Sequence, residues 1–91
     1  MARVLWTRQA IEDFDRVSER ARTRVSKRIG LLEEFPRLGN AMDGPYDGFR
    51  QLLLGRHRVI YVFDEDVDEV QIAYIRDGAR QLTLRVVAED E

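Results

Sequence analysis

The hydrophobic pattern of this chain changes its period once, and that change limits the folds open to it. Before Pro36, apolar residues recur at the roughly 3.6-residue spacing of a helix with one buried face. After Gly48 they gather in short runs of Leu, Val, Ile, Tyr and Phe, which are typical of strands. Residues 36–48 contain two Pro and three Gly and predict a long loop. The sequence therefore predicts an α+β fold in which helices come first and a sheet follows.

The helical part divides into two amphipathic helices in series. A short strand, Ala2–Trp6, is predicted first, and Thr7 can cap the helix after it. A break within residues 18–21 lets a second helix run to Glu34, so the two helices should form a hairpin. Their predicted buried stripes are Ala10, Phe14, Val17 and Ala21 in the first helix and Ala21, Val25, Ile29 and Leu32 in the second.

Three strands are predicted after the loop, over Phe49–Leu54, Arg56–Phe63 and Val70–Ile75. Gly55 and the acidic turn Asp64–Glu69 join them, so they should form an antiparallel meander. The segment that follows is open between a strand, which we favour, and a short helix. Its alternating apolar residues are Leu82, Leu84 and Val86.

Length and composition restrict the function. With 91 residues there is room for one domain, so residues 1–91 should form a single unit. Cys is absent, which excludes disulfides and thiolate metal sites, and no other ligand set suggests a metal or cofactor. A net charge of -2 argues against a general nucleic-acid binder, although a locally basic face stays open. No apolar run has the length of a membrane span or signal segment, which favours a cytoplasmic protein without membrane contact.

Four short motifs in a fixed order give the chain a family resemblance. They are Pro-x-x-Gly at residues 36–39, Arg-x-Leu at 50–52, Arg-Val-Ile-Tyr at 58–61 and Gly-Ala-Arg at 78–80. Together with the strand and helices before them, they resemble the RelE/ParE superfamily of toxins from type II toxin–antitoxin modules, from Val4 to Gln81. The resemblance implies an N-terminal helical hairpin packed on a small antiparallel sheet. It also implies a cognate antitoxin as partner in a hetero-oligomer.

Two activities dominate the superfamily: RelE-like members cut ribosome-bound mRNA, and ParE-like members poison DNA gyrase. For RNA cleavage, Arg58 and Arg80 match family arginines that would stabilise the phosphate, and His57 is the only side chain with an ordinary pKa near neutrality. However, neighbours on a strand point to opposite faces, so His57 and Arg58 are poor candidates for one site. Residues 81–86 also lack the Tyr or His that RNase members usually place there.

The resemblance therefore favours the ParE branch, with contact to gyrase as the mechanism. A metal-free mRNA endonuclease is the alternative, and a non-toxic antitoxin-binding module is the second alternative. The predicted target contacts are Arg50, Arg56, Tyr74, Arg76, Arg80 and Arg85. The predicted antitoxin contacts are Trp6, Phe14, Val25 and Phe35.

Structural roles compete with these functional ones. Arg58 could pair with Glu69 on a neighbouring strand, and Arg80 could pair with Asp77. A basic run in the second helix is interpreted as a solvated face, because Glu19 directly precedes it and two further Glu follow it. The run comprises Arg20, Arg22, Arg24, Lys27 and Arg28.

Overall fold

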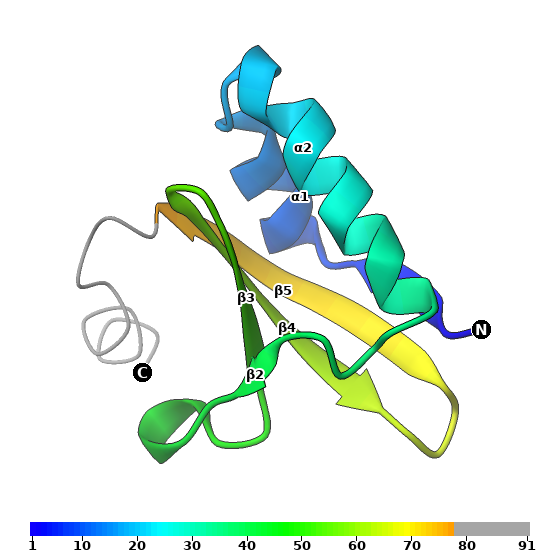
Figure 1. Cartoon of the computed structure of the whole chain (residues 1–91). Coiled ribbons are helices and arrows are strands. Elements are labelled where there is room, and N and C mark those ends of the chain that lie inside the picture. Colours follow the sequence, from blue (N-terminus) through cyan, green and yellow to red (C-terminus); the bar gives the residue numbers. More distant parts are fainter. Residues whose placement is uncertain (78–91) are drawn as a thin grey trace.

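A computed structural model describes residues 1–77 of the chain. The N-terminal part comprises β1 (Arg3–Trp6), α1 (Arg8–Asp15), α2 (Glu19–Gly30) and the 3-10 turn η1 (Leu31–Glu33). The rest comprises β2 (Asn40–Ala41), the 3-10 turn η2 (Gly44–Tyr46), β3 (Arg50–Leu54), β4 (His57–Asp64) and β5 (Glu69–Asp77). Both helices lie on one face of the sheet (Figure 1). The predicted α+β fold with an N-terminal helical hairpin is therefore confirmed.

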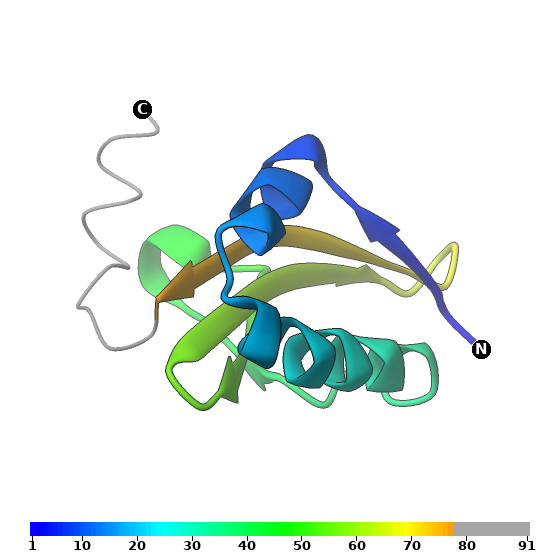
Figure 2. The same ribbon diagram turned by 90° about the horizontal axis from the view of Figure 1, so that it is seen from above.

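The five strands form one sheet in the order β1-β5-β4-β3-β2. The predicted meander of β3, β4 and β5 is confirmed, because each of these strands pairs antiparallel with the next. The sequence did not predict the short strand β2 or the pairing of β1. The first strand runs parallel to β5, with Arg3 opposite Glu69 and Trp6 opposite Ile72. Seen from above, α1 lies along β5 and α2 lies nearer to β3, on the same face of the sheet (Figure 2).

Hydroxyl side chains start both helices, close to where the sequence predicts. Thr7 Oγ1 accepts the N–H of Ala10 at 3.1 Å and donates to the carbonyl of Ile72 at 2.9 Å, which fixes the start of α1 on β5. Ser18 Oγ accepts the N–H of Ala21 at 3.3 Å, and α2 begins there. The α-helix ends at Gly30, four residues before the predicted end at Glu34, and the 3-10 turn η1 continues the coil to Glu33.

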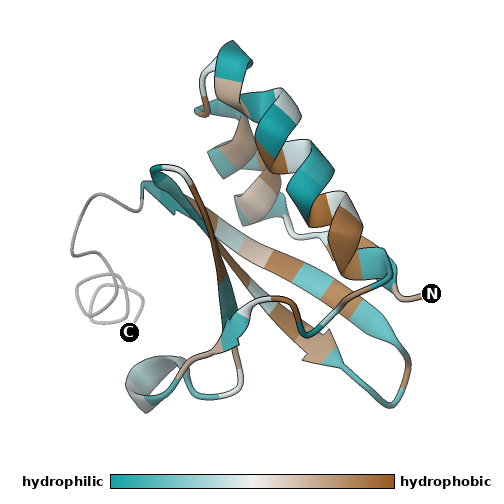
Figure 3. Ribbon diagram, viewed as in Figure 1, coloured by the Kyte–Doolittle hydropathy of each residue, from teal (hydrophilic) through white to brown (hydrophobic). Residues whose placement is uncertain are grey.

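The core lies between the helices and the sheet. Helical and strand residues alternate between hydrophilic and hydrophobic along their elements, as Figure 3 shows for α2 and β5. The described helices include none that is long and apolar enough to cross a membrane. The completely buried members of the core are Ala10, Val25, Leu32, Val59, Tyr61, Val70 and Ile72.

Three of the family motifs meet near the phenol of Tyr61. The hydroxyl of Tyr61 donates to the carbonyl of Pro36 and accepts the N–H of Gly39, both at 2.8 Å. Arg50 Nη1 closes the same loop by donating to the carbonyl of Gly39 at 2.7 Å. A Cβ on Gly39 would lie only 2.7 Å from the carbonyl oxygen of Gln51. The Pro-x-x-Gly loop and the strand tyrosine thus form a structural clasp, defined here as Pro36, Gly39, Arg50 and Tyr61.

This clasp predicts a loss of stability at alkaline pH. Burial raises the pKa of the Tyr61 phenol above its ordinary value of about 10, although the Gly39 hydrogen bond and the Arg50 charge act in the lowering direction. Above pH 10 the unfolded chain loses a proton that the folded chain retains. The stabilisation by the neutral phenol is therefore complete below about pH 10 and disappears as the pH rises through the raised pKa.

We expect the free energy of unfolding in urea to stay level between about pH 8 and pH 10, to fall above about pH 10, and to fall less in Tyr61→Phe. At pH 8 the variant should already be less stable by about 1–3 kcal/mol, because the buried N–H of Gly39 and the part-buried carbonyl of Pro36 lose their partner. Tyr74→Phe is the matched control, since it removes a half-buried phenol elsewhere on the sheet. An equally steep alkaline loss in Tyr61→Phe would show that another group titrates.

Candidate target-binding face

The face of the sheet turned away from the helices carries two of the predicted functional arginines. On β4, Val59 and Tyr61 belong to the core on the helix side, so Arg58 and Ile60 point to the other side. The strand register extends this surface across the sheet. We call it the outer face, and it comprises Gln51, Leu53, Arg58, Tyr74 and Arg76. Ile60 is on the same side of the sheet but has no exposed surface.

Arg58 and Arg76 are directly opposite each other on this face. Side chains in such a position have Cβ atoms about 4.5–5.5 Å apart, and like charges there repel. The guanidinium of Arg76 also lies over the ring of Tyr74, 4.6 Å from its centroid. Two planar donor forks beside an aromatic ring form a surface suited to carboxylate or phosphate groups.

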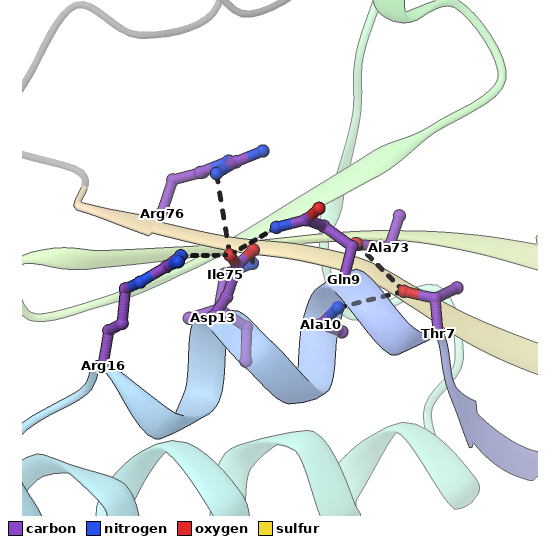
Figure 4. A network of polar contacts seen from close by, with 8 residues as sticks. All are labelled: Thr7, Gln9, Ala10, Asp13, Arg16, Ala73, Ile75 and Arg76. Atoms are coloured by element: carbon purple, nitrogen blue, oxygen red, sulfur yellow. Dashed lines mark hydrogen bonds and ion pairs between the residues drawn. The ribbon is translucent and has the colours of Figure 1, made fainter. Parts of the chain in front are cut away.

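The buried carboxylate of Asp13, on α1, forms an ion pair with Arg76 on β5 (Figure 4). Asp13 is only 3% exposed, and its Oδ1 lies 3.6 Å from Arg76 Nη1 and from Arg16 Nη1. The same oxygen accepts Gln9 Nε2 at 2.8 Å. Its Oδ2 accepts the backbone N–H of Ile75 at 3.0 Å.

The reason for this arrangement is the short length of β1. That strand pairs with β5 only as far as Ile72, so the edge of β5 beyond it has no strand partner. Helix α1 covers this edge, and Asp13 supplies the acceptor that a strand would have supplied. Sequence reasoning missed Asp13, although a signal was present: it lies three residues after Ala10, on the apolar stripe of its helix.

His57 lies on the opposite side of the sheet from Arg58, as strand alternation predicts. Its register partners are Leu54 and Asp77, and it lines a cavity of about 280 Å³ beneath the C-terminal end of α1. Its Nδ1 is buried and makes no hydrogen bond with the described part of the chain. The structure therefore does not bring His57 and Arg58 together in one site.

The expected pairing of Arg58 with Glu69 is wrong. Glu69 starts β5 at the other end of the strand, opposite Asp64, and its Oε2 lies 3.6 Å from Arg3 Nη2. Another predicted target arginine, Arg56, lies on the exposed turn after β3. Its Nη2 donates to Oδ2 of Asp77 at 3.2 Å.

Of the other predicted target contacts, Arg50 lies within the described residues, and Arg80 and Arg85 do not. Arg50 lies on the helix side, where its guanidinium holds the clasp, which gives it a structural role. Arg80 and Arg85, with the predicted pairing of Arg80 to Asp77, lie outside the described residues. Within residues 1–77, no three His, Asp or Glu side chains gather so as to hold a metal ion.

The predicted antitoxin contacts differ in their exposure to solvent. Trp6 and Phe14 meet edge to face, with ring centroids 5.2 Å apart, and are partly buried at the margin of the core. Phe35 follows η1 and is 51% exposed. Val25 has no exposed surface, because the inner face of α2 packs on the core. Val25 is therefore a core residue, and we withdraw it from the predicted contacts.

Comparison with known families decides where the chain belongs. The family model described as the ParE toxin of the type II toxin–antitoxin system parDE matches residues 4–82. The chain belongs to the ParE toxin family. A search among curated proteins finds no match.

Solved structures share the fold of this ParE-family chain. The toxin–antitoxin complex RelBE2 from Mycobacterium tuberculosis includes a chain with 22% identity and a TM-score of 0.76, with 84% of this chain and 96% of that chain covered. The isolated RelE toxin from E. coli has 14% identity and a TM-score of 0.75 over the whole of both chains. A YoeB/ParE toxin from Agrobacterium tumefaciens has 17% identity and a TM-score of 0.70, with 82% and 96% covered. The chain thus has the fold of these RelE and ParE toxins, and its sequence matches the ParE family model.

Proposed function

We propose that this toxin inhibits growth by contact with DNA gyrase through the outer face of its sheet. The observation that carries the proposal is the chemistry of that face. Arg58 and Arg76 offer fixed positive charge, and Tyr74 adds an aromatic ring. Arginine does not give up its proton in proteins, so it binds anionic groups but does not act as a base.

RNA cleavage requires proton transfer as well as charge, and the described residues supply it poorly. A base must remove the proton of the attacking hydroxyl, and an acid must protonate the leaving oxygen. The only His of the chain, His57, lies on the other side of the sheet from Arg58, although it lines one cavity with Arg76. The only Lys, Lys27, is on the exposed side of α2. A binding surface is therefore better supported than a catalytic site, in agreement with the match to the ParE family model.

A cognate antitoxin is the second part of the proposal. The relatives solved as complexes include RelBE2 from Mycobacterium tuberculosis and intact RelBE from E. coli, each described as a toxin–antitoxin complex. On this chain, partly exposed aromatic rings of Trp6, Phe14 and Phe35 remain available beside the helices. A segment that folds on binding would complete their burial.

Two experiments test the proposal. In vitro, purified gyrase should lose supercoiling activity in the presence of the chain. In cells, after a short pulse of regulated expression without antitoxin, a reporter mRNA from the arrested cells should remain intact by primer extension. Codon-phased cuts in the message, with gyrase unaffected, would overturn the proposal in favour of the mRNA endonuclease. Normal growth with both readouts negative would instead indicate a module that only binds its antitoxin.

Arg58→Ala should separate toxicity from antitoxin binding. We expect inhibition of gyrase to weaken roughly tenfold or more, as happens when a central interface arginine is truncated. Antitoxin affinity should stay the same, because Arg58 and the helices lie on opposite sides of the sheet. Arg3→Ala, which removes an arginine that is 71% exposed at the far end of β5, is the matched control. Full growth inhibition by Arg58→Ala at equal abundance would show that Arg58 is structural.

A further inference from the structure

The exposed side of α2 carries a row of positive charges that lies away from the outer face and has no part in the function proposed above. Five of the twelve residues of this helix are Arg or Lys, and one is Glu. Four of the basic residues recur at helical spacing on one side, and all four are exposed. We call them the α2 stripe, and they are Arg20, Arg24, Lys27 and Arg28.

The stripe works against the stability of its own helix. Arg24 has a like charge four residues before it, at Arg20, and another four residues after it, at Arg28. Each such pair destabilises a helix by about 0.2–0.5 kcal/mol. Glu19, directly before the stripe, forms no ion pair with it in the described part of the chain. A local conflict of this kind is expected where a surface serves a partner.

Other arginines of the molecule have the carboxylate or carbonyl partners that the stripe lacks. Arg3, Arg16 and Arg37 each have a carboxylate within ion-pair distance, and so has Arg56. Arg22, which is on α2 but off the stripe, donates from Nε to the carbonyl of Val17 at 3.0 Å. Among residues 1–77, no acidic side chain lies within ion-pair distance of any member of the stripe.

The shape and chemistry of the stripe favour phosphate over a protein surface. Its residues and Thr23 line a shallow groove of about 350 Å³ that contains no apolar side chain. Protein interfaces usually centre on buried aromatic or aliphatic anchors, which are missing here. Arginine forks and hydroxyls, in contrast, are common contacts of nucleic-acid phosphates.

The dimensions of the stripe fit a double helix. From Arg20 to Arg28 it extends about 12 Å at the helical rise of about 1.5 Å per residue. Duplex DNA carries one negative charge per about 1.7 Å of its axis, so several phosphates lie within reach.

We propose that the α2 stripe binds the phosphate backbone of duplex DNA without regard to sequence. The choice of DNA rests on the proposed function, because duplex DNA is the substrate of gyrase. The net charge of -2 means that attraction must be local to this helix. The stripe would thus add affinity for gyrase that is engaged with DNA over gyrase that is free.

The direct test is fluorescence anisotropy of the full chain with a labelled duplex of arbitrary sequence and about 20 base pairs, titrated between about 50 and 200 mM salt. We expect a logarithmic slope near -3, which corresponds to three or four phosphates neutralised. Arg24→Gln combined with Arg28→Gln should reduce this slope by about two and weaken binding at least tenfold at low salt. Arg3→Gln combined with Arg8→Gln changes the net charge equally at exposed positions off the stripe, and should bind like the wild type.

Three results would overturn the inference. They are an absence of duplex binding by the wild type, an equal loss in both double variants, and tighter binding to a single-stranded RNA of the same length. None of them bears on the outer face. A chain that inhibits gyrase but does not bind the duplex would therefore refute the role of the α2 stripe and leave the proposed function standing.

Discussion

Gly39→Ala should lower the free energy of unfolding by about 3 kcal/mol, at the upper end of the range for overpacked sites. The added Cβ would lie 2.7 Å from the carbonyl oxygen of Gln51 and 2.8 Å from Cε1 of Tyr61. The first of these atoms belongs to the backbone of β3, so it cannot turn aside as the end of a flexible side chain can. Relief requires the loop to move away from Tyr61, which breaks the clasp.

Urea unfolding followed by circular dichroism would measure this effect, with Gly30→Ala as the matched control. A Cβ at Gly30 would meet open space, and that residue already has helical dihedral angles, φ -59° and ψ -29°. Alanine there should therefore leave stability unchanged or raise it by about 0.5–1 kcal/mol. Equal behaviour of the two alanine variants would show that the loop accommodates a side chain at Gly39 and that the close approach is not a constraint.

The second large effect is expected at the buried carboxylate of α1. Asp13→Ala should destabilise the fold by about 3 kcal/mol, because it leaves the N–H of Ile75 buried without an acceptor and releases Arg76. The exposed Arg16, with 73% of its side chain accessible, should contribute little to this loss. The change should also loosen the end of β5, because Asp13 replaces a strand partner there.

Hydrogen exchange at the Ile75 amide measures the local part of this prediction, and urea unfolding measures the whole. Glu12→Ala is the control, since it removes an exposed carboxylate from the adjacent position of the same helix. Asp13→Asn should lie between the two, because its amide oxygen can still accept from Ile75. Unchanged protection of Ile75 in Asp13→Ala would mean that another group caps the edge of β5.

Hydrophobic period was enough to predict the layers of this molecule. The stripe of Ala21, Val25 and Ile29 is buried in α2, and the runs after Gly48 became strands, because burial of one face fixes both periods. Hydroxyl residues at the predicted starts supplied the helix caps. These signals are local, so they can be recognised without knowledge of the tertiary structure.

Features that depend on distant segments were not predictable in the same way. The parallel pairing of β1 with β5 depends on which edge of the meander is free, and the sequence of Arg3–Trp6 does not encode that choice. The structural use of Arg50 was missed for a related reason, since its partner Gly39 comes from a loop eleven positions earlier. The assignment of Val25 to a binding surface failed because one apolar stripe cannot both form the core and face a partner.

The pairing of β1 with β5 also has a consequence for synthesis of the toxin. The first strand has no other partner in the sheet, and its residues pair with residues 69–72. A nascent chain cannot complete its sheet until nearly all of the described residues have been made, and contacts so distant in sequence form slowly. The sheet therefore cannot close around β5 before residue 72 has left the ribosome.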